Sequence, residues 1–113
     1  MSTQETGGGP PGTGTVSGGG PEAACNVDGA TGNASSSVGC SVVRTTNGVY
    51  TITLTIPRSA ANSVILATPQ FVLAGGTTID AEYSVSPKIL VQTASVTTGL
   101  LTDCSFSFAL FVV

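Results

Sequence analysis

The chain divides near residue 24 into two segments of different composition. Residues 1–24 contain eight of the fifteen glycines and three of the six prolines in the 113-residue sequence. A segment of this composition buries too little apolar surface to order itself. From Cys25 onward, short runs of alternating apolar and polar residues follow one another. The sequence therefore predicts a flexible Gly/Pro-rich N-terminal arm over residues 1–24 and a single folded head domain over residues 25–113.

Alternation with a period of two is the main pattern of the head domain. In residues 49–56, every second side chain from Tyr50 to Ile56 is apolar, and threonines lie between them. This pattern predicts a strand with one buried face. Residues 78–85, which end at Val85, and residues 105–113 repeat it. We expect strands over residues 38–45, 49–56, 63–68, 71–74 and 78–85, one or two strands within residues 88–97, and a last strand over residues 105–113. Together they predict an all-β fold, a small antiparallel sandwich or barrel of about seven or eight strands.

Turn residues separate the apolar runs. Asp28-Gly29 and Gly32-Asn33 are strong turn dipeptides, so we expect a loop over residues 26–37. Asn47-Gly48 predicts a type I′ hairpin between the strands on either side. Helical periodicity is confined to residues 58–66, which predict at most one helical turn.

The three cysteines, Cys25, Cys40 and Cys104, predict buried thiols rather than a disulfide framework. Their number is odd, and the N-terminal residues lack the basic and apolar regions of a signal peptide. Cys40 is in phase with Val38, and Cys104 is in phase with the phenylalanines that follow it, so both thiols should face the core. A bridge between Cys25 and Cys40 stays open at this point.

Charged residues are few, and their balance limits the partners of the chain. Three basic and six acidic residues leave a net charge of −3. We therefore expect no binding to nucleic acid or to an anionic membrane surface, because both need a basic patch. No apolar run reaches the length of a membrane span.

We find no candidate catalytic centre in the sequence. Histidine is absent, which excludes Ser-His-Asp and Cys-His catalysis within one chain. Asp80 and Glu82 share one face of a predicted strand, where a glycosidase pair or a calcium site could form. A solvated strand face is the simpler interpretation. We expect no enzymatic activity, no cofactor and no metal site.

The C-terminal strand is apolar on both faces near its end. Ser105 and Ser107 share one face with Phe111 and Val113. Either the strand is central and covered on both sides, or this face meets another subunit. An open apolar strand is an aggregation hazard. The second interpretation predicts a subunit interface that includes Ser105, Ser107, Phe111 and Val113.

Three short motifs give the head domain a family resemblance. They are Gly48-Val49-Tyr50-Thr51-Ile52-Thr53-Leu54-Thr55-Ile56-Pro57, Ala67-Thr68-Pro69, and the closing Ser105-Phe106-Ser107-Phe108 with its aliphatic end. With these motifs, residues 38–113 resemble a small β domain that recurs in phage and large-virus structural proteins, in the heads of fibres, spikes and capsid-attached proteins. The motifs are patterns of strands and turns, and they contain no catalytic or ligand-binding residue that could be carried over.

The resemblance implies a non-enzymatic structural protein located in the virion. The short arm favours a capsid decoration or head-fibre protein over a tail-fibre tip. The implied partners are the major capsid protein or another virion protein, and further copies of this chain in a homotrimer. The arm would attach the head to the capsid, and its candidate anchoring residues are Gly9, Pro10, Pro11, Val16 and Pro21.

The alternative function is a receptor- or glycan-binding tip domain of a fibre, with a host glycan as its ligand. Such a site needs exposed aromatic side chains over a shallow surface. Tyr50 and Tyr83 are instead in phase with apolar strand faces. The sequence therefore favours the capsid-bound protein.

Overall fold

The head domain is built from eight strands. The computed structural model describes residues 20–70, 73 and 75–113. Its strands are β1 (Ala23–Val27), β2 (Ala34–Val38), β3 (Cys40–Thr46), β4 (Val49–Leu54), β5 (Ser63–Pro69), β6 (Thr77–Tyr83), β7 (Lys88–Ser95) and β8 (Phe106–Val112). Within the described residues, helix is limited to a 3₁₀ turn at Ala60–Asn62, which lies inside the predicted helical turn.

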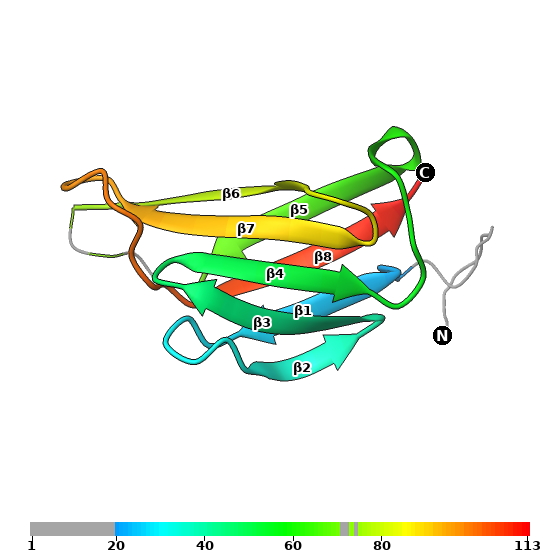
Figure 1. Ribbon diagram of the computed structural model, residues 1–113, viewed down its shortest axis with the longest axis horizontal. Helices are drawn as coiled ribbons and strands as arrows, with labels where there is room; N and C mark the ends of the chain where they lie inside the picture. The colour runs from blue at the N-terminus through cyan, green and yellow to red at the C-terminus, as the bar shows by residue number, and fades with distance from the viewer. Residues whose placement is uncertain (1–19, 71–72, 74) are drawn as a thin grey trace, which may run out of the picture.

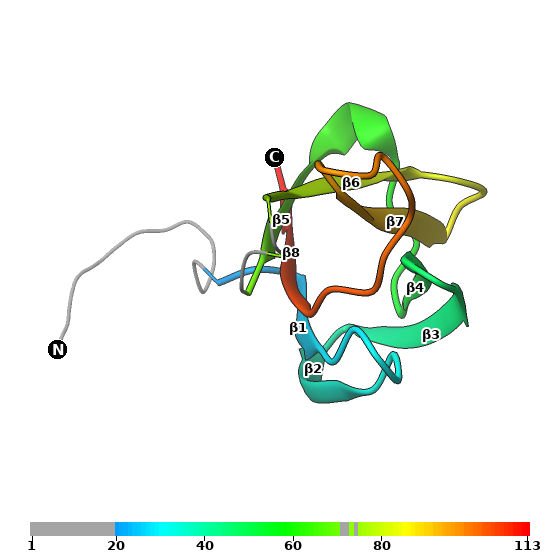
Figure 2. The ribbon, with the colours of Figure 1, turned by 90° about the vertical axis from the view of Figure 1, so that its left-hand side faces the viewer.

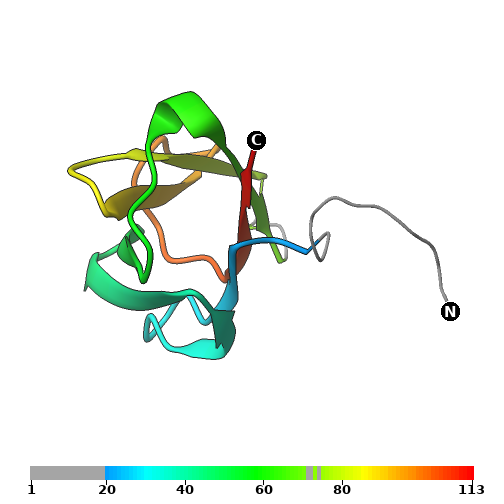
Figure 3. The same ribbon diagram turned by 90° about the vertical axis from the view of Figure 1, so that its right-hand side faces the viewer.

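The strands form two four-stranded sheets, whose arrangement can be followed in Figure 1. Sheet A has the strand order β2-β1-β8-β5, and sheet B has the order β3-β4-β7-β6. Every hydrogen-bonded pair of strands is antiparallel. The views along the strands in Figure 2 and Figure 3 show the two sheets on opposite sides of one interior. The predicted all-β antiparallel sandwich is therefore confirmed.

One core fills the space between the sheets. Alternate residues of β1, β4, β7 and β8 are buried, because a strand sends successive side chains to opposite faces. Tyr50 of β4 and Phe106 of β8 meet edge to face across the sheets, with their ring centroids 5.0 Å apart. The other buried members of the core are Ala23, Cys25, Val27, Ile52, Leu54, Ile89, Val91, Phe108 and Leu110. Removal of this apolar surface from water is the main force that holds the sheets together.

The sandwich closes along one side, where β5 of sheet A lies next to β6 of sheet B (Figure 2). The hydroxyls of Ser63 and Tyr83 form a hydrogen bond of 2.7 Å across this seam. Ile65 and Ile79 extend the apolar core to it. At the other edge of sheet A, β2 pairs with β1.

The first two strands depart from the expectation based on sequence. β1 begins at Ala23, so the predicted boundary after residue 24 falls inside a strand, and β2 occupies part of the predicted loop 26–37. Ala23 and Val27 are both 1% exposed. β1 is five residues long, and its pattern is too short to identify from sequence. Its position between β2 and β8, rather than local propensity, selects the extended conformation.

Three apolar side chains that were expected to face the core are exposed instead. β4 and β6 end before Ile56 and Val85, so these residues lie beyond the strands and are 53% and 74% exposed. Gly39 has a φ of +69° between β2 and β3. This left-handed residue interrupts the predicted strand 38–45, so Cys40 packs against the core as predicted, whereas Val38 is exposed.

Three further predictions about single elements agree with the structure in the part of the chain that it describes. Residues 88–97 contain one strand, β7, rather than two. The turn at Asn47 and Gly48 joins β3 to β4, and Gly48 has a φ of +72°. Cys104 is buried, as its phase with the following phenylalanines predicts. The positions that lie outside the described residues are three of the four in the predicted strand 71–74 and the arm residues Gly9, Pro10, Pro11 and Val16.

Candidate functional site

The outer face of sheet A is the candidate functional site. Its four strands, all of them described by the structure, contain no charged residue. The strands of sheet B contain Arg44, Asp80, Glu82 and Lys88. Charged residues are depleted from the centres of protein interfaces. The outer face of sheet A is therefore better suited to a lasting contact than the outer face of sheet B.

A row of small and aliphatic side chains crosses all four strands of sheet A. The strand register places Ala24 beside Val38 on one side and beside Ala109 on the other. Ala109 in turn lies beside Leu66. Val38 and Leu66, at the two ends of the row, are 56% and 53% exposed. We call these four residues the apolar row.

A row of polar side chains runs beside the apolar row. The register aligns Ser36 with Asn26, Asn26 with Ser107, and Ser107 with Thr68. Ser107 Oγ donates to Asn26 Oδ1 over 2.7 Å, and the side-chain amide of Gln70 lies 3.4 Å from Asn26 Oδ1 and 3.3 Å from Ser107 Oγ. Because Asn26, Ser107 and Gln70 already bond to one another, covering them costs less than covering unpaired polar groups.

The residues predicted to form a subunit interface occupy three different environments. Ser107 and Phe111 lie on the outer face of β8, where Phe111 is beside Val64 of β5. Val113 follows β8 and is largely exposed. Ser105 precedes β8, and its hydroxyl accepts a hydrogen bond of 3.0 Å from the Gly29 amide. Ser105 is thus engaged within the head domain, and β8 is a central strand of sheet A.

A shallow hollow of about 280 Å³ opens over β2, β1 and β8. The residues that line it are Ala24, Cys25, Asn26, Ser36, Ser37, Val38, Ser107 and Phe108. Among them, Cys25 and Phe108 belong to the buried core, and Ala24, Asn26 and Ser107 lie on the outer face of sheet A. A hollow in a flat sheet face gives the side chain of a packing partner a place to insert, which increases shape complementarity.

An ion pair lies where the arm joins the head domain. The guanidinium of Arg58 binds the carboxylate of Glu22. The Glu22 amide donates a hydrogen bond of 2.8 Å to the Leu110 carbonyl, which continues the pairing of β1 with β8 by one residue. Pro21, the one described residue among the predicted arm anchors, is exposed. The arm therefore meets the head at the edge of the outer face where Phe111 lies.

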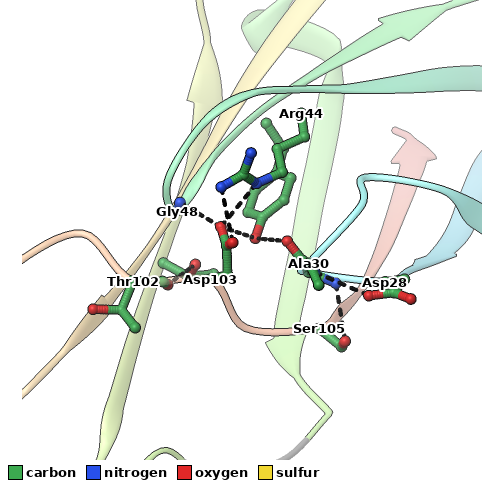
Figure 4. Close-up of polar contacts among 10 residues, drawn as sticks. Asp28, Ala30, Arg44, Gly48, Thr102, Asp103 and Ser105 are labelled. Carbon is green, nitrogen blue, oxygen red and sulfur yellow. Dashed lines mark hydrogen bonds and ion pairs between the residues drawn. The ribbon is translucent and has the colours of Figure 1, made fainter.

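A second polar site, around Asp103, joins three segments of the head domain (Figure 4). Arg44 binds both carboxylate oxygens of Asp103, over 3.1 and 2.9 Å, and the Gly48 amide donates to Oδ1 over 2.7 Å. The Tyr50 hydroxyl lies 3.2 Å from the same oxygen and 2.8 Å from the Gly29 carbonyl. These donors take up most of the acceptor capacity of the carboxylate. Asp103 therefore acts as a clamp between the β3–β4 hairpin and the segment that precedes β8.

The contacts of Asp103 also set its ionisation. Burial disfavours the charged carboxylate, but the hydrogen bonds from Arg44, Gly48 and Tyr50 outweigh this effect and hold the pKa of Asp103 below its ordinary value. Burial likewise raises the pKa of the Tyr50 hydroxyl, which stays protonated and can donate. The charged form of Asp103 is thus the form that the folded head stabilises.

Asp103→Asn is expected to lower the free energy of unfolding at pH 7 by about 1–3 kcal/mol, because buried donors lose a charged acceptor. The depressed pKa sets the sign of the pH dependence. Stabilisation by the carboxylate is present above its unfolded-state pKa of about 4 and is lost as the pH falls through the folded-state pKa. The difference in the free energy of unfolding between wild type and variant, measured with urea, should therefore be full at neutral pH. It should shrink below about pH 4.

The control for this substitution is Asp80→Asn, which removes an exposed carboxylate from the outer face of sheet B. It should change the free energy of unfolding at pH 7 by less than about 0.5 kcal/mol. Equal losses in the two variants, or a difference at Asp103 that does not shrink in acid, would contradict the clamp.

The residues considered for glycan binding or catalysis do not form a joint site. Asp80 and Glu82 are exposed on sheet B, as expected for a solvated strand face. Tyr50 is fully buried and Tyr83 is partly buried, so neither offers the open aromatic surface that a glycan would need.

In the described part of the chain, acidic and cysteine side chains form no group of three or more that could hold a metal ion. Nor do the described residues contain a helix with the length and hydropathy to span a bilayer.

Sequence reasoning identifies only the β8 part of the outer face of sheet A. Val38, Ala24 and Leu66 lie on three other strands, and their alignment with Ala109 depends on strand pairing. The signal that could have indicated this face is the lack of charge in all four strands.

In comparisons with known proteins, no family model, no curated protein and no solved structure matches the chain.

Proposed function

We propose that this protein is a non-enzymatic structural protein of a virus particle, a capsid decoration or head-fibre protein. In this proposal the head domain packs against further copies of the chain through the outer face of sheet A. The Gly/Pro-rich arm attaches the assembly to the capsid. The observation that carries the proposal is the uncharged outer face of sheet A, with its exposed apolar row.

The two outer faces of the sandwich differ in a way that supports assembly through sheet A. The apolar row of sheet A meets solvent through Val38 and Leu66. Its neighbouring polar row is internally hydrogen bonded through Asn26 and Ser107. A contact over these rows would bury apolar surface without stranding charges, and the bonds between Asn26 and Ser107 would lower the cost of covering their polar groups. The outer face of sheet B would bring Asp80, Glu82 and Lys88 into any such contact.

The family resemblance supports the viral part of the proposal. Its motifs fall on three strands of the sandwich: residues 48–57 include β4, residues 67–69 end β5, and residues 105–108 begin β8. The resemblance is also the source of the proposed number of copies, three. A head of about 90 residues buries a modest fraction of its surface alone, and oligomerisation is a common remedy.

The position of the arm supports its proposed role in attachment. The arm enters the head through Pro21 and Glu22, beside the outer face of sheet A. Copies that pack through this face would therefore gather their arms near one another. Several weak attachments in one assembly raise the apparent affinity for a capsid far above that of one arm.

Co-sedimentation with intact particles of the virus that encodes the chain tests this function. We expect the full chain to bind in a saturable way. Deletion of residues 1–19, which leaves every described residue in place, should weaken binding at least tenfold, or about 1.4 kcal/mol. Thermal unfolding of the truncated head should match wild type, because no described core residue is lost.

Two outcomes would overturn the proposal. The first is a full chain that does not bind the particles. The second is a truncated head that binds as tightly as the full chain, which would show that the arm does not contribute to attachment. Binding of the full chain to host glycans, without binding to particles, would favour the receptor-binding alternative.

A further inference from the structure

We propose that Cys25 and Cys40 form a disulfide that joins sheet A to sheet B when the protein meets a small disulfide oxidant such as glutathione disulfide. Both residues are free thiols in this structure. Cys25 lies in the middle of β1 in sheet A, and Cys40 is the first residue of β3 in sheet B. The bond would cross from one layer of the sandwich to the other.

The backbone brings the two cysteines together at the crossing from β2 to β3. Gly39 packs so tightly against β1 that a Cβ at this position would lie 2.3 Å from the Glu22 carbonyl oxygen. The Cys40 sulfur lies 3.8 Å from the carbonyl oxygen of Ala24, the residue before Cys25. Both cysteines pack in the same apolar core, and each thiol contributes to the pKa of the other. The Cys40 sulfur thus lies against the backbone of β1 next to Cys25, and a disulfide needs the two sulfurs to close to about 2.0 Å.

The environments of the two thiols assign their order of reaction. Cys25 is buried, and burial together with the neighbouring Cys40 raises the pKa of its thiol to about 12. Burial also raises the pKa of Cys40, but interactions with Cys25 and Ala24 act in the opposite direction, and Cys40 is partly exposed. The thiolate is the reacting species. Cys40 is therefore the thiol that reacts first with a reagent from solvent.

The reaction is two thiol–disulfide exchanges. The Cys40 thiolate attacks one sulfur of glutathione disulfide, forms a mixed disulfide and releases one glutathione thiolate. The Cys25 thiolate then attacks the Cys40 sulfur of the mixed disulfide and releases the second glutathione. The cysteine pair loses two electrons and two protons, and one glutathione disulfide is reduced to two thiols.

The third cysteine serves as an internal reference. Cys104 is 1% exposed, and its sulfur lies 3.5 Å from the carbonyl oxygen of Ser105, in the segment that precedes β8. It belongs to the end of the head where Asp103 lies, whereas the pair lies at the crossing from β2 to β3. Oxidation of the native head should therefore consume Cys25 and Cys40 and leave Cys104 as a thiol.

The test uses the full chain, equilibrated with glutathione disulfide, then denatured, alkylated and analysed by intact mass and peptide mapping. We expect one bridge between Cys25 and Cys40, a single alkylation at Cys104, and an intact mass lower by two hydrogens before alkylation. The oxidised protein should also melt about 10 °C above the same sample after reduction, since the bridge closes a loop of about 15 residues.

Variants separate the bridge from general effects on folding. Cys104→Ser should give the same bridge and the same rise in melting temperature. Cys25→Ser should stop at the mixed disulfide between Cys40 and glutathione, with no comparable rise. Recovery of three alkylated thiols after equilibration, a bridge that includes Cys104, or a bridge that leaves the wild-type melting temperature unchanged would overturn the proposal. The wild-type comparison before and after reduction needs no variant, so it stands even if Cys25→Ser fails to fold.

Discussion

Leu66→Asp is expected to convert the proposed assembly into monomers. Leu66 belongs to the apolar row of sheet A and is 53% exposed in the single chain, so the head itself tolerates a polar side chain there. In the proposed contact the new carboxylate would be stranded among apolar side chains, which is strongly unfavourable. A cost of about 4 kcal/mol would raise the dissociation constant about a thousandfold. Light scattering over a concentration series measures this change.

Val43→Asp is the matched control for this substitution. Val43 is 64% exposed on β3, in the sheet whose strands carry the charged residues, and the variant should keep the wild-type mass. Two results would contradict the proposed contact through sheet A. One is a wild-type protein that is monomeric at high micromolar concentration, and the other is a Leu66→Asp protein that keeps the mass of the assembly. Circular dichroism of Leu66→Asp must still show the β-rich spectrum of wild type, because an unfolded variant would contradict the tolerance claimed for this site.

Gly48→Ala is expected to destabilise the head by about 3 kcal/mol or more, through left-handed strain and overpacking together. Gly48 has a φ of +72°, and a Cβ there would lie 2.5 Å from the Thr93 carbonyl oxygen and 2.7 Å from the Thr102 amide nitrogen. Both of these are backbone atoms. The Gly48 carbonyl also accepts a hydrogen bond from the Thr93 amide, and its own amide donates to Asp103. Any shift that makes room for a methyl group must therefore disturb β7 or the Asp103 clamp.

Gly99→Ala separates the two causes of this loss. Gly99 has nearly the same φ, +71°, but a Cβ there would meet no atom within 4 Å. Left-handed strain alone should cost about 1–2 kcal/mol at this position. Urea unfolding of the two variants, analysed with a common m-value, gives the comparison. Equal losses in the free energy of unfolding would show that the close backbone contacts at Gly48 do not add to the effect of the substitution.

The part of the fold that could be predicted from sequence is the part encoded by local alternation. Residues 49–54 and 106–112 place an apolar side chain at every second position, and these strands supply Tyr50, Ile52, Phe106 and Phe108 to the core. Strict alternation of apolar and polar residues predicts a strand with one buried face. The all-β class and most of the core follow from it without knowledge of any contact between distant residues.

The candidate site was only partly accessible from sequence, because it depends on register. Phe111 and Ser107 share a face by parity within one strand, which local reasoning can establish. The apolar row instead needs Ala109 to lie beside Ala24 in one direction and beside Leu66 in the other. These partners are separated by 85 and 43 positions in the chain, so no local window contains them.

By itself, the sequence determined that this chain is a β protein with a Gly/Pro-rich arm, with few charges and without the histidine that many catalytic sites need. Only the tertiary structure decided that β1 is a strand, that Asp103 holds Arg44 and Gly48 together, and that Cys40 lies against β1. The physical reason is the range of the interactions. Alternation is a property of neighbouring residues, whereas strand order, clamps and thiol contacts arise when sheet pairing and burial bring together residues that are far apart in the chain.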